Sequence, residues 1–162
     1  MIGAFNNTLL LGLGLFFLVV ALALMLRVMI LRSISGQRQA AFLDAETQRL
    51  FGVALLAGTL RVERHRPNLA VLVGHTAGGL PLLITLEVYS TLIGARSLRL
   101  NAQVLAPVEP SAVRLADAHT LARRYGGSAR LGRGALEIHI PRAQHNVDDG
   151  GMLLEELATL AL

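Results

Sequence analysis

The feature that most constrains the fold is an apolar run near the N-terminus, LLLGLGLFFLVVALALMLRVMILR, which fills residues 9–32. Residues 8–26 contain no charged residue and no proline. As an α-helix the run would be roughly 36 Å long, and the hydrocarbon core of a bilayer is about 30 Å thick. The sequence therefore predicts a transmembrane helix over residues 8–32.

Two other interpretations of the run are a cleaved signal peptide and a buried core helix. Ala21-Leu22-Ala23 matches the small-residue pattern of a signal-peptidase site. However, residues 1–7 carry no Lys or Arg, and the apolar run continues beyond that site. A core helix of a soluble domain would show a polar face over this length. A permanent anchor is therefore favoured.

Arginines gather at only one end of the run. Residues 1–7 have no basic side chain, whereas Arg27, Arg32 and Arg38 lie at or beyond the other end. Because positive charge favours the cytoplasmic side, we expect residues 1–7 to form a short extracytoplasmic tail and everything after residue 33 to be cytoplasmic. We expect the three arginines to meet anionic lipid headgroups. The predicted location is the inner (cytoplasmic) membrane, crossed once.

Residues 33–38 are predicted as a polar hinge and residues 39–162 as one cytoplasmic domain of ordinary size. Helical spacing predicts a helix that follows the hinge and ends at Gly58. Four strand-like runs with period-two alternation come next, at residues 59–65, 69–76, 80–89 and 97–104. Because short turns join them, we expect them to pair antiparallel.

The rest of the domain is predicted to add a hairpin and to cover the sheet. Its elements are a helix opened by Pro110 and Ser111 and closed by Gly126-Gly127, a hairpin turning at 132–134, and a helix from about Asp148. The fold class is α+β: a two-layer domain with a mainly antiparallel sheet of about six strands, covered by two or three helices. The residues expected in the core are Leu43, Leu50, Phe51, Ala54 and Ala57; Leu82, Ile84, Leu86 and Val88; Leu98, Leu100, Ala102 and Val104; Leu115, Ala118, Leu121, Ala122 and Tyr125; Leu136, Ile138 and Ile140; and Leu153, Leu157 and Leu160.

Composition excludes several kinds of chemistry. The chain has 162 residues and no Cys, and all 15 of its basic Lys or Arg residues are Arg. Without Cys there is no thiol nucleophile, disulfide, cysteine-ligated iron–sulfur cluster or covalent c-type haem. Without Lys there is no Walker lysine and no Schiff base. Aromatic residues are only 4% of the chain, which argues against nucleic acid as a partner. We predict no cofactor.

No catalytic, cofactor-binding or metal site is predicted with a recognisable motif. The segment GHTAGG (74–79) is glycine-rich, but a strand pattern follows it, so a hairpin turn is favoured over a phosphate-binding loop. Glu137 and His139 share the outer face of one strand and His145 lies just beyond, which leaves a metal or acid–base pair conceivable. Solvated histidines are favoured instead for all five: His65, His75, His119, His139 and His145.

These observations favour a non-catalytic accessory subunit of a larger bacterial-type membrane complex. Its helix would pack among other membrane helices through the small residues Gly12 and Gly14, and its domain would contact partner subunits. The layout is similar to that of the H subunit of type II photosynthetic reaction centres, with one N-out helix and a cytoplasmic β-containing domain. That similarity of layout implies an energy-transducing assembly, photosynthetic or respiratory. The alternatives are a membrane-tethered enzyme using Glu137, His139 and His145, and a module that binds anionic lipids through its arginines.

Overall fold

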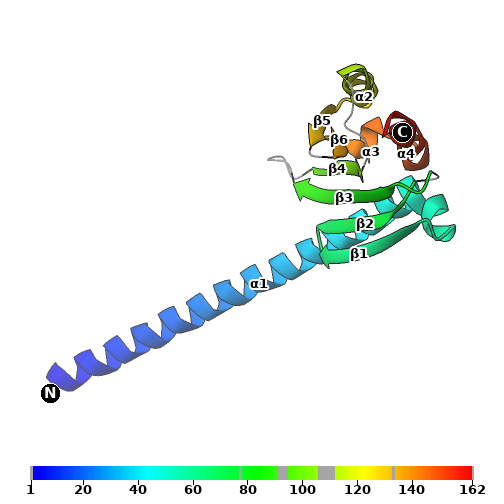
Figure 1. The fold of residues 1–162 in the computed structure, drawn as a ribbon. Coiled ribbons are helices and arrows are strands. Elements are labelled where there is room, and N and C mark those ends of the chain that lie inside the picture. The colour runs from blue at the N-terminus through cyan, green and yellow to red at the C-terminus, as the bar shows by residue number, and fades with distance from the viewer. Residues whose placement is uncertain (1, 77, 91–94, 106–111, 133, 162) are drawn as a thin grey trace. The chain divides into compact units, whose positions relative to one another are not determined.

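The computed structural model describes residues 2–76, 78–90, 95–105, 112–132 and 134–161, except the side chains of residues 2–11, 64, 65, 112–114, 132 and 161. Its elements are shown in Figure 1. In chain order they are α1 (Ile2–Leu56), β1 (Leu60–Arg66), β2 (Leu69–His75), β3 (Pro81–Ser90), β4 (Arg96–Leu105), α2 (Ala112–Arg124), β5 (Ser128–Gly132), β6 (Ala135–Ile140), α3 (Ala143–Asn146) and α4 (Gly150–Ala161).

The N-terminal helix α1 is uninterrupted from Ile2 to Leu56. It includes residues 33–38, so the segment predicted as a hinge has helical backbone. No proline removes a hydrogen bond there. The hydroxyl of Ser35 donates to the carbonyl oxygen of Arg32, one turn back, at 3.2 Å, so this serine is accommodated within the helix. At residues 33–38 the surface of α1 therefore becomes more polar, but the helix continues.

Contacts divide the chain into two compact units, Met1–Arg38 and Gln39–Leu162. Within the described residues, one helical stretch, Gly12–Leu56, is long and apolar enough to cross a membrane. The most apolar part of this stretch has a mean hydropathy of 2.7, and none of that part is buried in the protein. Length and composition thus match those of a membrane-spanning helix.

Helix α1 ends where the sequence predicts. Gly58 adopts a positive φ of 72°, a conformation that glycine reaches without a steric penalty. The amide of Gly58 donates to the carbonyl of Leu55, and both the amide and the hydroxyl of Thr59 donate to the carbonyl of Ala54. These bonds satisfy carbonyl groups that the last turn leaves without helical partners.

The six strands form one antiparallel sheet in the order β1-β2-β3-β4-β6-β5. The first four make the meander expected from their short turns. Strand β6 then pairs with β4, placing Leu100 opposite Ile140, and β5 becomes the far edge. Strand β6 therefore lies beside β4, and β5 lies beside β6, even though α2 separates both from β4 in the chain.

One face of the sheet is packed and carries the core. The period-two pattern is confirmed in β3 and β4: from Leu82 to Val88 and from Leu98 to Val104, every second residue is apolar and buried. Helices α2, α3 and α4 lie together on one side of the sheet (Figure 1), and Leu43, Leu50 and Phe51 of α1 join the same core. Most of the expected core residues are buried; Leu115, Ala54, Tyr125 and Leu160 are half-buried and Ala57 is exposed.

The C-terminal helices differ from the expectation in detail. Helix α4 begins at Gly150, two residues after the predicted start, because Asp149 acts as its N-cap: Asp149 Oδ1 accepts from the amide of Gly151 at 2.8 Å. The single turn α3 was not predicted. It follows Arg142, which has a positive φ of 58°. The predicted helix opening at Pro110 and Ser111 lies outside the described residues.

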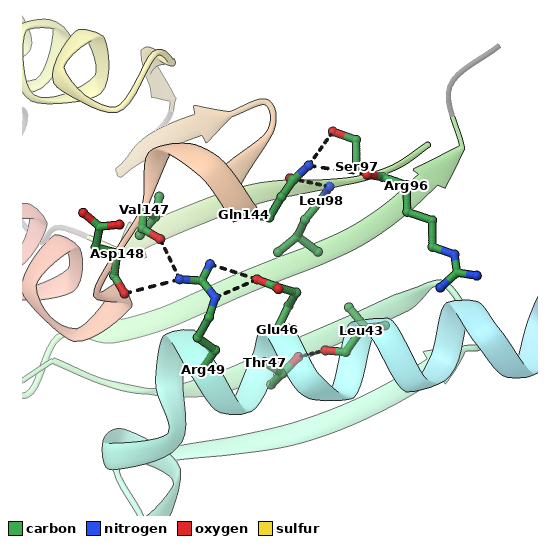
Figure 2. A network of polar contacts seen from close by, with 10 residues as sticks. All are labelled: Leu43, Glu46, Thr47, Arg49, Arg96, Ser97, Leu98, Gln144, Val147 and Asp148. Atoms are coloured by element: carbon green, nitrogen blue, oxygen red, sulfur yellow. Dashed lines mark hydrogen bonds and ion pairs between the residues drawn. The ribbon is translucent and has the colours of Figure 1, made fainter. Parts of the chain in front are cut away.

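Two long polar side chains hold the end of the domain together, as Figure 2 shows. Arg49 of α1 donates from Nη1 to the carbonyl of Val147 at 3.1 Å and to that of Asp148 at 3.4 Å. Gln144 of α3 accepts from the amide of Leu98 at 2.8 Å and donates to Ser97 Oγ at 3.2 Å. Gln144 thereby supplies hydrogen bonds along β4 where its neighbour β6 has ended.

Candidate functional site

The second face of the sheet is called here the outer face; no helix among the described residues of Gln39–Leu162 covers it. Two rows of residues cross all six strands in register. The first row is Arg61, Val73, Leu83, Gln103, Glu137 and Arg130, and the second is Glu63, Val71, Thr85, Asn101, His139 and Ser128. In these two rows β2 contributes two valines and β3 contributes Leu83 and Thr85, whereas β4, β5 and β6 contribute only polar side chains.

Several charges on the outer face are paired with each other. Arg61 forms an ion pair with Glu63 on the same strand, and Arg99 forms one with Glu87 at 3.3 Å. The guanidinium of Arg99 also lies 5.0 Å from the centre of the Tyr89 ring, a cation–π distance. These exposed pairs add little stability.

At the β4–β6–β5 end of the outer face there is a hollow of about 240 Å³, called here the polar cavity. Its lining consists of Asn101, Ser128, Arg130, Glu137 and His139. Glu137 is held by Gln103, whose Nε2 donates to Glu137 Oε1 at 3.0 Å. The cavity is therefore lined by a cation, an anion, an imidazole, a hydroxyl and an amide, which come from three adjacent strands.

The electrostatics of the cavity favour a neutral histidine. Partial burial lowers the pKa of His139 below its ordinary value, and the positive charges of Arg99 and Arg130 lower it further. At neutral pH the ring therefore carries one N–H donor and one acceptor nitrogen. The same groups would support an acid or base if a reactant were present.

The structure brings some of the sequence-predicted site residues together and separates others. Glu137 and His139 line one cavity, whereas His145 is exposed on α3 and does not line it. His75 lies at the end of β2 and His119 on α2. The side chain of His65 lies outside the described residues. Within those residues no group of three or more His, Asp or Glu side chains is arranged to hold a metal ion.

A second hollow, called here the apolar groove, lies between the end of α1, the β1–β2 edge and α4. It measures about 350 Å³, and its lining includes Val53 and Ala57 at the end of α1, Leu60 of β1, and Leu154 and Ala158 of α4. Acidic side chains also line it: Asp149 and Glu155. Val53 is 85% exposed, and the nearby Leu56 is 90% exposed. The domain thus leaves the side chains of Val53 and Leu56 uncovered.

The residues predicted to act in the membrane all lie on α1. A Cβ added at Gly12 or Gly14 would meet no atom within 4 Å, so close packing at these glycines requires a helix from another chain. Arg27, Arg32 and Arg38 are all exposed. At 100° per residue, Arg32 is rotated about 140° around the axis from Arg27, whereas Arg38 is only about 20° away. The arginines therefore point to more than one side of α1.

Sequence reasoning missed three members of the polar cavity: Asn101, Ser128 and Arg130. The alternation of β4 does place Asn101 on the outer face, but no local signal brings β5 and β6 beside it. That juxtaposition depends on β6 pairing with β4 across the intervening α2.

Comparison with known proteins adds no relative. No protein-family model, no curated protein and no solved structure matches the chain.

Proposed function

We propose that the chain is a single-pass, non-catalytic accessory subunit of a larger membrane protein complex. Residues 1–7 form a short extracytoplasmic tail, and residues 39–162 contact partner subunits in the cytoplasm. The observation that carries the proposal is the apolar groove with the bare side chains of Val53 and Leu56 beside it. Soluble monomers seldom leave contiguous apolar surface exposed unless it contacts a partner.

The expected occupant is a segment of a partner subunit with apolar side chains flanked by basic ones. Valine, alanine and leucine line the floor of the groove, and Asp149 and Glu155 place negative charge along it. Charge complementarity at such a rim sets orientation and association rate, while the apolar anchor supplies affinity. The helix would join the same assembly, since α1 leaves Gly12 and Gly14 open to another helix.

The orientation rests on charge. Arg27, Arg32 and Arg38 lie on the domain side of the most apolar part of α1, and no Lys or Arg precedes them. The reaction-centre layout described above is compatible with this arrangement, but the proposal does not depend on it. The lipid-binding alternative would use the same arginines without a protein partner.

The complex is tested by extraction from native membranes in mild detergent, followed by native-gel sizing and mass spectrometry. We expect stoichiometric migration with a larger assembly. Val53→Asp should release the chain from it, because this change adds a charge to an apolar and acidic groove. Ala116→Asp, at an exposed position of α2 outside the groove, should not. Migration alone as a monomer or homo-oligomer would overturn the proposal. If the Val53→Asp variant still migrated with the assembly, the groove would be excluded as the contact surface.

The topology is tested by single-cysteine labelling, because the chain has no native Cys. With a membrane-impermeant maleimide on intact spheroplasts, Asn7→Cys should be labelled and Ala116→Cys should be labelled only after lysis. Labelling of Ala116→Cys without lysis would place the domain outside. Loss of the first 23 residues from the mature chain would show that the run is a cleaved signal peptide.

A further inference from the structure

The polar cavity contains groups that the domain itself does not use. Among the described residues, the side chains of Asn101, Ser128, Arg130 and His139 make no hydrogen bond or ion pair with another protein group, and Glu137 Oε2 accepts none. Other charges on the outer face do find partners, as the pairs of Arg61 with Glu63 and Arg99 with Glu87 show. Ser128 and Arg130 are exposed, and polar groups that converge on a hollow without protein partners are available to orient a small ligand.

The composition of the lining limits the charge of a ligand. Arg130 is the one guanidinium of the lining, and its planar fork of donors matches a single carboxylate. Glu137 lines the same hollow, so a dianion such as phosphate would face a like charge there. A monoanionic group bound by Arg130, with Ser128 and Asn101 as neutral hydrogen-bond partners, fits this charge distribution best.

Glu137 indicates that the ligand also carries a hydrogen-bond donor. One of its carboxylate oxygens is occupied by Gln103, and the other is left to accept from a hydroxyl or an ammonium group. In register, Glu137 is directly opposite Arg130 across the β5–β6 pair, so the anionic group and the donor must lie close together in the ligand. A hollow of about 240 Å³ is below the range of about 300–1,000 Å³ typical of sites for drug-sized molecules.

We propose that the polar cavity binds a small carboxylic acid that carries a hydroxyl or amino group on the neighbouring carbon. Arg130 holds its carboxylate with help from Ser128 and Asn101, and Glu137 accepts from its hydroxyl or ammonium group. Neutral His139 completes the lining; its N–H can donate to the carboxylate, and its other ring nitrogen can accept from the hydroxyl or ammonium group. This site shares no residue with the apolar groove, so the inference stands apart from the proposed accessory role.

The test uses the full chain in zwitterionic detergent micelles at neutral pH, titrated with glycolate, glycine or acetate. Binding is followed through the backbone amide NMR signals of Asn101, Ser128 and His139. We expect saturable binding of glycolate or glycine and binding of acetate weaker by about tenfold, because acetate lacks the donor for Glu137. Arg130→Gln should weaken the better ligand by at least tenfold. Arg123→Gln, exposed on α2 outside the cavity, should leave affinity unchanged.

Several results would overturn the proposal. One is the absence of saturable chemical-shift changes with all three acids. Another is equal affinity of the Arg130→Gln variant and the native chain for the better ligand. A third is an affinity for acetate equal to that for glycolate and glycine. A parallel titration with inorganic phosphate that gave the tightest binding would overturn the assignment to a carboxylate. If Arg130→Gln changed the fold by circular dichroism, Ser128→Ala would replace it, with an expected loss of about threefold.

Discussion

Helix α1 offers a comparison within one continuous element. Residues 12–38 and residues 39–56 belong to the same helix, yet their apolar side chains are satisfied in different ways. In the first stretch the described large apolar side chains are exposed, from Leu13 to Ile34. In the second stretch Leu43, Leu50 and Phe51 are buried in the domain core.

The difference lies in the pattern, not in the helix. Residues 12–26 are apolar around the whole circumference, so no single neighbouring surface of the protein would cover them, whereas lipid would. Residues 39–56 carry an apolar stripe with Asp44, Glu46, Gln48 and Arg49 on other sides, which suits one protein face. We therefore expect a charge to disrupt the first stretch wherever it is placed, and to be tolerated at the exposed positions of the second.

The largest contrast is expected from charge in the first stretch. Leu18→Asp combined with Leu22→Asp should cost about 5–7 kcal/mol of membrane insertion, at about 2.5–3.5 kcal/mol per Asp at the helix centre. We expect most of the protein to become extractable by alkaline carbonate. As a control, Ala41→Asp with Gln48→Asp, at exposed positions of the second stretch, should stay in the membrane fraction. Equal retention of both variants would mean that residues 12–26 are not the anchor.

The second stretch is tested by truncating one buried and one exposed side chain in the same turn. Phe51 is 1% exposed and Val53 is 85% exposed. Phe51→Ala should lower the free energy of unfolding by about 3–5 kcal/mol, whereas Val53→Ala should change it by less than about 0.5 kcal/mol. Urea unfolding of the full chain in micelles measures both. Similar losses of unfolding free energy for the two variants would mean that the buried face of this stretch has been assigned incorrectly.

The repetitive parts of the fold were predictable from the sequence. Alternation in β3 and β4 gave the correct buried face, and the helical spacing of residues 39–57 gave Leu43, Leu50 and Phe51, because both patterns repeat within one element. The end of α1 was predictable because Gly58 marks it locally. Alternation alone also places Arg99 and Glu87 on the outer face, but only the register of β3 with β4 sets them opposite each other.

Features that depend on distant partners were not predictable. Helix α3 is a single turn, too short to show a helical period. The role of Gln144 depends on its hydrogen bonds to β4, which is distant in the sequence. The polar cavity requires β6 to pair with β4, so that Asn101 lies opposite His139. The expected hinge at 33–38 was inferred from polarity alone, and a helix tolerates polar residues as long as its backbone hydrogen bonds are kept.

A smaller effect with opposite signs is expected from two glycines near the end of the second stretch. A Cβ at Gly150 of α4 would lie 2.4 Å from Phe51 Cε1 and 2.7 Å from the carbonyl oxygen of Leu50, whereas one at Gly52 would meet only Gln48 Oε1, at 3.5 Å. Gly150→Ala should therefore destabilise the domain by about 1–3 kcal/mol. Gly52→Ala should stabilise it by about 0.5–1 kcal/mol through helix propensity. Thermal unfolding of both variants gives the signs, and a stabilising Gly150→Ala would contradict the close approach of α4 to α1.

The smallest effect concerns how Arg49 contributes to the second stretch. Its guanidinium reaches two carbonyls, of Val147 and Asp148, and also forms an ion pair with Glu46 at 2.8 Å. Arg49→Met keeps the aliphatic stem but removes all of these bonds, and we expect a loss of about 1 kcal/mol, because the side chain is partly exposed. Urea unfolding of the full chain measures it.

Glu46→Gln separates the two contributions of Arg49, because it removes the ion pair and leaves the carbonyl bonds intact. An i,i+3 ion pair on a helix surface contributes about 0.2–0.5 kcal/mol, so this variant should lose clearly less than Arg49→Met. If the two losses were equal, the carbonyl bonds would contribute nothing measurable. Arg49 would then be an ordinary surface residue, and the burial of Leu43, Leu50 and Phe51 would alone distinguish the second stretch of α1 from the first.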